Sequence, residues 1–177
     1  MDNNNDKFYQ YIFINPGCYF RKIKRELGYS VGTTQYQLNK LEKEGKIVSY
    51  SNGFYKSYFA NGLFDENEKK ILQILNQKSL REILLFIIEK KNSTKQDIVK
   101  KFEISYSTAT WYLEKLIDSN LILEKKNGKF TLYFVNPDVK TTPITVQLLK
   151  KYYSNIWNTW ANRLAEFFLL LSKEEGR

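Results

Sequence analysis

The sequence contains no histidine and only one cysteine, Cys18, among its 177 residues. Without histidine there can be no Ser–His or Cys–His nucleophile pair, no imidazole general base and no His-ligated zinc site. A single cysteine cannot form an internal disulfide, which is typical of proteins of a reducing cytoplasm. We therefore expect a cytoplasmic protein that is not an enzyme, that needs no cofactor or metal, and whose one thiol is inert.

Long apolar runs are also missing. Runs such as Phe167–Leu171 are far too short to cross a bilayer. The first residues are polar and acidic, unlike a signal peptide, so we expect no membrane association. What the chain has in excess is positive charge, with 28 Lys and Arg against 19 Asp and Glu. This balance favours an anionic partner, and nucleic acid is the first candidate.

The sequence repeats itself without a gap. Sliding the chain along itself until Thr33 meets Thr108 places Gly32–Ile47 on Ser107–Ile122. The match extends on both sides, to Ile23 with Ile98, Ser30 with Ser105, Asn52-Gly53 with Asn127-Gly128, Tyr58 with Tyr133, and Asn61 with Asn136. An ungapped register of this length predicts two copies of one small domain.

Apolar periodicity predicts three helices in the first copy, over Lys7–Ile14, Cys18–Leu27 and from Val31 onward. On the third helix the predicted buried stripe recurs every three to four residues, at Val31, Thr34, Leu38, Leu41 and Gly45. A hairpin follows, Ile47–Tyr50 with Phe54–Phe59, because Asn-Gly between apolar runs is a strong hairpin signal. Three helices and a hairpin make a winged helix-turn-helix.

The second copy follows the same plan. Its predicted elements are helices Leu80–Glu89, Thr94–Phe102 and Ser107–Ser119, with a buried stripe of Tyr106, Ala109, Leu113 and Leu116, and a hairpin of Ile122–Glu124 with Phe130–Val135. A helix from Glu66 to about Gln77 joins the copies, and a long helix, capped by Thr142 with Pro143 at its first position, runs to about Ser172.

The predicted fold class is thus mainly α with small β-hairpin wings (α+β). It comprises two tandem winged helix-turn-helix domains, residues 1–62 and 79–137, a connecting helix, residues 63–78, and a C-terminal helix for dimerisation, residues 138–177.

The residues of the first copy resemble a known family, the tandem winged helix-turn-helix transcription regulators of archaea. The resemblance is carried by Asn15-Pro16-Gly17, Leu27-Gly28, Gly32-Thr33, Tyr36, Leu38, Leu41-Glu42, Gly45 and Ile47. It implies that the third helix enters the DNA major groove while the wing contacts the flanking backbone or minor groove.

Groove recognition needs hydrogen-bonding side chains on an outward helix face. The candidate base-reading residues are Thr33, Gln35, Tyr36 and Gln37 in the first copy and Thr108, Thr110 and Trp111 in the second. The first copy is expected to read more sequence, because the second presents more aromatic residues. Candidate phosphate contacts are Lys22, Lys24, Arg25, Lys40 and Lys56, then Lys95, Lys100, Lys101, Lys115, Lys125, Lys126 and Lys129.

The C-terminal helix has an apolar seam at nearly heptad spacing, formed by Leu149, Tyr153, Ile156, Trp160, Leu164, Phe167 and Leu171. It predicts a homodimer paired through these helices, with the alternative that the helix folds back over its own chain. We therefore expect a dimeric transcription regulator that binds double-stranded DNA. The competing interpretation is a winged-helix protein–protein interaction module without specific DNA binding, whose C-terminal helix binds a partner.

Overall fold

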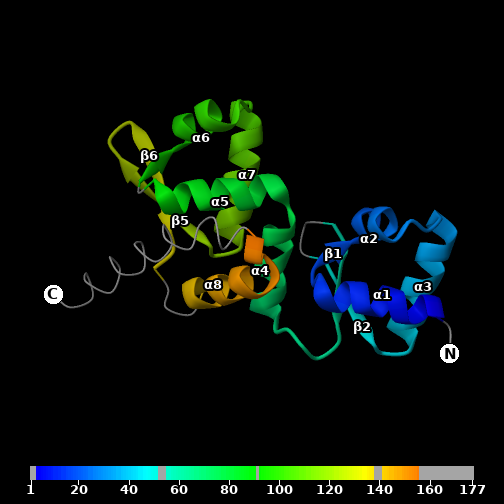
Figure 1. Ribbon diagram of the computed structural model, residues 1–177. Coiled ribbons are helices and arrows are strands. Elements are labelled where there is room, and N and C mark those ends of the chain that lie inside the picture. Colours follow the sequence, from blue (N-terminus) through cyan, green and yellow to red (C-terminus); the bar gives the residue numbers. More distant parts are fainter. Residues whose placement is uncertain (1–2, 52–54, 91, 138–140, 156–177) are drawn as a thin grey trace. The chain divides into compact units, whose positions relative to one another are not determined.

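The structure is a computed structural model that describes residues 3–51, 55–90, 92–137 and 141–155. The chain divides into two compact units, Met1–Asn76 and Gln77–Arg177, each of which is described here by itself. Both are mainly helical with one small antiparallel sheet, which confirms the predicted fold class (Figure 1). No described helix is long and apolar enough to cross a membrane.

Unit 1 is a three-helix domain with a small sheet and a further helix. Its described elements are α1 (Asn3–Ile14), β1 (Cys18–Tyr19), α2 (Phe20–Leu27), α3 (Val31–Lys43), β2 (Ile47–Tyr50), β3 (Ser57–Ala60) and α4 (Glu66–Asn76). Unit 2 repeats this order and ends with a helix of its own. Its described elements are α5 (Lys78–Glu89), β4 (Ser93–Thr94), α6 (Lys95–Phe102), α7 (Tyr106–Asp118), β5 (Ile122–Asn127), β6 (Phe130–Val135) and α8 (Thr141–Tyr152).

The two units share their strand register as well as their element order. The sheets are ordered β1-β3-β2 and β4-β6-β5. Cys18 pairs with Tyr58 in the first sheet, and Ser93 pairs with Tyr133 at the equivalent place in the second. The predicted sequence repeat is therefore also a structural repeat. The strands β1 and β4 were not predicted, because two-residue strands leave no periodic signal.

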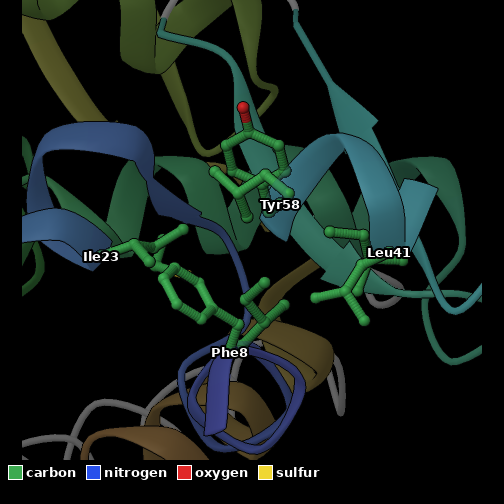
Figure 2. Packing of buried hydrophobic residues seen from close by; sticks show 8 residues of the cluster. Phe8, Ile23, Leu41 and Tyr58 are labelled. Carbon is green, nitrogen blue, oxygen red and sulfur yellow. The ribbon is translucent and has the colours of Figure 1, made fainter. Parts of the chain in front are cut away.

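The core of unit 1 gathers around α1 and holds the other helices in place. Phe8 of α1, Ile23 of α2, Leu41 of α3 and Tyr58 of β3 are all at most 2% exposed, and their side chains converge in Figure 2. Burial of such a side chain contributes about 1.5–3 kcal/mol. Because one face of α3 is fixed against this core, its opposite face is turned to solvent.

α4 is held against the loop end of the unit 1 hairpin by one buried amide. The Nε2 of Gln73 donates to the carbonyl oxygens of Tyr50 and Tyr55, at 3.3 and 3.1 Å, and to the hydroxyl of Ser57 at 3.1 Å. The first two residues flank the loop of the wing, and Ser57 begins β3. Gln73 therefore stabilises the two ends of this loop.

The predicted buried stripes are correct in their centres and wrong at their ends. Thr34, Leu38 and Leu41 are buried. Val31 is 57% exposed, and Tyr106, its counterpart in unit 2, is 56% exposed. Both residues begin their helices, and helical side chains tilt toward the N-terminus, so a side chain in the first turn projects beyond the core. Gly45 is exposed too, because α3 ends at Lys43 and Gly45 lies in the left-handed region after it, with a φ of 67°.

The wing of unit 2 is a regular hairpin. Its last pair, Asn127 with Phe130, leaves a two-residue loop of Gly128 and Lys129. Gly128 has a φ of 61°, and a type II′ turn requires such a positive φ at its first central position. The hairpin was predicted correctly. Its strand β5 extends to Asn127 and is three residues longer than the predicted segment, which ended at Glu124.

The C-terminal helix differs from the uninterrupted one predicted. α8 begins at Thr141, two residues before Pro143, and ends at Tyr152. Of the predicted dimer seam, Leu149 is 1% exposed within a single chain, so its side chain is not available to a second one. Tyr153 lies near Arg81, whose guanidinium carbon is 5.4 Å from the ring centroid. The remaining seam residues, Ile156, Trp160, Leu164, Phe167 and Leu171, lie outside the described residues.

Candidate nucleic-acid interface

The two third helices begin with the same cap. The hydroxyl of Ser30 accepts a hydrogen bond from the backbone N–H of Thr33 at 3.1 Å, and Ser105 does the same for Thr108 at 3.1 Å. The cap hydroxyls also contact the hydroxyls of Thr33 and Thr108, at 2.9 and 2.8 Å. Thr33 and Thr108, two of the three predicted base-reading threonines, are thus half-buried and engaged in capping their own helices.

The outward face of α3 is a stripe at helical spacing. Gly32, Tyr36, Asn39 and Lys43 follow one another by four, three and four residues, and all four are exposed. Tyr36 is the most prominent, with 62% of its surface exposed. We call these residues the α3 stripe. It contains one cation, one phenol, one amide and no carboxylate.

Beside the stripe, Gln35 and Asn39 form an amide pair. The Nε2 of Gln35 donates to the Oδ1 of Asn39 at 2.8 Å, and both residues are exposed. The bond leaves the Gln35 carbonyl oxygen and the Asn39 N–H groups without a protein partner among the described residues. A neighbouring acceptor and donor pair is the combination with which Gln and Asn recognise the N6 and N7 of adenine.

Gln37 does not lie on this outward face, and its predicted exposure is wrong. It is 4% exposed, and its Oε1 has no hydrogen-bond partner among the described residues. Gln37 lies three residues after Thr34 and four before Leu41, so it borders the buried stripe. The sequence prediction placed it outside because Gln37 is not a member of the predicted buried stripe.

Asn39 and Lys43 were missed by the sequence prediction. Both belong to the same helix face as Tyr36, three and seven residues after it, and this spacing is the signal that could have identified them. Lys43 also lies in the last turn of α3, where a cation is favoured by the helix dipole.

The predicted phosphate contacts of unit 1 lie on α2, on α3, which carries Lys40, and in the segment just before β3. Lys22 and Lys24 of α2 are half-buried, and the Nζ of Lys22 donates to the Oδ1 of Asn76 at 3.1 Å. Arg25 is exposed and pairs with its neighbour Glu26 at 2.7 Å. Lys56, beside the wing loop, pairs with Glu42 of α3 at 3.2 Å. Surface pairs of this kind are weak, so these cations can exchange a carboxylate for a phosphate.

On α7 the stripe equivalent to that of α3 is acidic and aromatic. It consists of Ser107, Trp111, Glu114 and Asp118, all exposed. We call these residues the α7 stripe. The Trp111 ring, 44% exposed, lies 5.1 Å from the Tyr112 ring and 5.9 Å from the Nζ of Lys115. Tyr106 begins the same helix, and its carbonyl oxygen accepts a 2.8 Å hydrogen bond from the hydroxyl of Thr110.

The remaining predicted phosphate contacts of unit 2 lie on α6 and the wing. Lys100 and Lys101 are exposed in the last turn of α6, and Lys95 at its start is half-buried. The wing cations are exposed; they are Lys125, Lys126 and Lys129.

Cys18 is buried, and burial raises the pKa of its thiol to about 12. Very little thiolate is then present at neutral pH, in keeping with the predicted inert thiol. Within the described part of the chain, no group of three or more Cys, Asp or Glu side chains is placed to hold a metal ion.

Comparison with protein families assigns both units. Residues 3–72 match a family model described as an N-terminal HTH domain, and residues 76–122 match one described as winged helix-turn-helix DNA-binding. The chain consists of two tandem helix-turn-helix domains. It is homologous to an uncharacterized HTH-type transcriptional regulator of the archaeon Methanocaldococcus jannaschii, with 28% identity over 141 residues. These findings confirm the resemblance to archaeal tandem helix-turn-helix regulators.

That alignment covers 78% of this chain and 35% of the relative, so the chain spans about a third of the relative's length. Among solved structures, HlyU from Vibrio cholerae is similar with 16% identity and a TM-score of 0.42, over 50% of this chain and 98% of that one. Wild-type ZitR of Lactococcus lactis in complex with DNA has 16% identity and a TM-score of 0.34, over 82% and 96%. The assignment rests on the two family models and the archaeal relative.

Proposed function

We propose that this helix-turn-helix protein binds double-stranded DNA sequence-specifically as a transcription regulator, and that α3 of unit 1 is its reading helix. The observation that carries the proposal is the α3 stripe with the adjoining Gln35–Asn39 pair. This face offers amide donors and acceptors, a phenol and a cation to a groove. A 13-residue helix is about 20 Å long, and the major groove is about 12 Å wide and admits it.

Gly32 supports the same orientation of α3. A Cβ at this position would meet only the hydroxyl oxygen of Ser30, at 4.0 Å, so the packing of unit 1 does not require a glycine here. Glycine inside a helix costs about 1 kcal/mol relative to alanine. A bare backbone in the first turn of an exposed helix lets a phosphate or a base edge approach closely.

The basic residues beside α3 supply sequence-independent affinity. Lys24 and Arg25 on α2, with Lys40 and Lys43 on α3, place cations on the two helices of the helix-turn-helix. Contacts of this kind position a protein on the duplex without reading it, and they make affinity fall steeply as salt rises.

The test is the salt dependence of binding to a labelled duplex of about 40 base pairs, measured by fluorescence anisotropy between about 50 and 300 mM KCl. We expect Lys24→Ala/Arg25→Ala to weaken binding to all duplexes alike and to lower the slope of log K against log salt by about 2. A protein that is not retained on any duplex near 150 mM salt would contradict the proposal.

The competing function is a winged-helix module that binds another protein. The observation that favours it is Trp111, an exposed indole on the helix that the winged helix-turn-helix of unit 2 would direct at DNA. Large exposed aromatics are enriched at protein interfaces. The anisotropy measurement separates the two functions, because a protein-binding module has no reason to show a salt-dependent affinity for duplex DNA that α2 and α3 control.

A further inference from the structure

We propose that the two units use DNA unequally: unit 1 reads bases with α3, whereas unit 2 contacts the phosphate backbone with its wing and keeps α7 out of the groove. This inference rests on the proposed function and adds the division of work between the units. It is carried by a position-by-position comparison of α3 and α7, which have the same length, cap and place in their units.

The outward stripes differ in charge at two of their four positions. Asn39 of α3 corresponds to Glu114 of α7, and Lys43 corresponds to Asp118. As a whole, α3 carries two lysines and one glutamate, whereas α7 carries one lysine and two carboxylates. Within the part of the chain that the structure describes, neither Glu114 nor Asp118 forms an ion pair with a Lys or Arg side chain.

These carboxylates lie where a helix in the groove would meet phosphates. The Debye length at physiological salt is about 8 Å, so a carboxylate on the surface of a helix between two phosphate backbones is not screened from them. Asp118 also lies in the last turn of α7, where a negative charge is disfavoured by the helix dipole. The α7 stripe therefore repels the ligand that the α3 stripe attracts.

The polar groups in the first half of α7 are occupied within the helix itself. The Thr110 hydroxyl donates to the carbonyl oxygen of Tyr106 at 2.8 Å. Ser107 and Thr108 both contact the hydroxyl of Ser105, at 2.9 and 2.8 Å. No amide pair like that of Gln35 and Asn39 exists on α7, because Thr110 and Glu114 stand at those positions. We therefore do not expect Thr108, Thr110 and Trp111 to read bases.

The wing of unit 2 has the features that α7 lacks. The strand pair Tyr50 with Ser57 is the last one of the unit 1 hairpin, and its equivalent, Lys125 with Leu132, is followed by two more pairs in unit 2. This longer ladder and its two-residue turn hold Lys125, Lys126 and Lys129 on a regular, exposed hairpin. A basic hairpin of this kind fits a phosphate backbone without needing to read a sequence.

The experiment installs the unit 1 residues in unit 2, as Glu114→Asn/Asp118→Lys in the full chain. Its control is Glu82→Asn/Glu89→Lys on α5, which changes two exposed carboxylates and the net charge by the same amount. On a 40-base-pair duplex near 150 mM KCl, we expect the α7 variant to bind about tenfold more tightly than the parent and clearly more tightly than the control. Site selection with the variant should also recover a longer motif than with the parent.

A second variant tests the wing, Lys125→Ala/Lys126→Ala/Lys129→Ala. We expect weaker binding, a salt slope lower by about 3 and an unchanged selected motif. If the α7 variant binds no better than its control, or the wing variant keeps the parent's salt slope, the unequal use of the units is overturned. If the parent itself fails to bind duplex DNA, the proposed function fails instead, so the two failures are distinguishable.

Discussion

Asn39 and Glu114 occupy the same outward position on two equivalent helices, and the second of them carries a negative charge where the first carries a neutral amide. Each lies three residues after an exposed aromatic ring, Tyr36 or Trp111. The duplication thus kept the scaffold while the surfaces of the two helices diverged. This difference leads to the first prediction.

Transferring the unit 2 charges to unit 1, as Asn39→Glu/Lys43→Asp, should weaken duplex binding at least about tenfold near 150 mM salt. The reason is that two carboxylates would then face the phosphates along α3. The matched control is Gln10→Glu/Lys7→Asp on the exposed side of α1, which changes the net charge equally. Anisotropy titrations measure the affinity of both variants for duplex DNA. An equal loss of affinity in the two variants would mean that overall charge, not the α3 stripe, governs binding.

The second prediction separates two glutamines that look alike in the sequence. Gln35→Ala should relax the selected DNA motif, since its amide pair with Asn39 lies on the exposed face. Gln37→Met should leave the motif unchanged and keep stability the same or raise it by up to about 1 kcal/mol, because it removes a buried carbonyl oxygen that has no partner among the described residues. Site selection and thermal unfolding measure the two effects, and a motif altered by Gln37→Met would refute the buried placement.

Gly32 provides a test in which stability and binding move in opposite directions. Gly32→Ala should stabilise the protein by about 0.5–1 kcal/mol, because alanine favours the helix and its Cβ would meet only the hydroxyl oxygen of Ser30, at 4.0 Å. The same methyl group should weaken DNA binding by obstructing close approach to α3. The control is Ser107→Ala at the equivalent position of α7, which should leave DNA affinity unchanged. Tighter or unchanged binding by Gly32→Ala would remove the support that Gly32 gives.

The fourth prediction concerns pH and the cap of α6. Hydrogen bonds from Lys90 and Thr94 lower the pKa of Asp97 from 3.8 to about 2. Because the folded-state pKa is the lower one, this stabilisation is fully present above pH 4 and is lost as the pH falls toward about 2. Asp97→Asn should destabilise the protein at neutral pH by about 0.5–2 kcal/mol and flatten the acid side of its stability profile. Chemical unfolding between pH 2 and 7 measures both effects, and an unchanged profile would show that the cap contributes nothing.

The repeat let the sequence predict the fold, because apolar spacing and the Asn-Gly signals are local and occur twice. The sequence-based prediction of burial failed where a residue's surroundings depend on packing against residues far away in the chain. Gln37 is buried since it borders the stripe that faces the core, whereas Val31 is exposed because that core does not extend to the first turn of α3. The contacts of Gln73 with the wing loop join residues 16 to 23 positions apart and have no local signature.

Among the candidate site residues, helical spacing placed Gln35 and Tyr36 on the exposed face of α3 correctly. It could not show that Thr33 and Thr108 are occupied by their caps. Nor did residue type alone draw attention to Asn39 and Lys43, although their spacing of three and seven residues from Tyr36 places them on the same helix face.

The central claim is that α3 reads duplex DNA, and selection from a random duplex library near 150 mM salt tests it most directly. The purified full chain and its Gln35→Ala variant would be taken through the same selection rounds and sequenced. We predict that the parent recovers a defined motif and that Gln35→Ala recovers a degenerate version of it at one or two positions. No enriched motif for the parent, or an identical motif for both proteins, would contradict the claim.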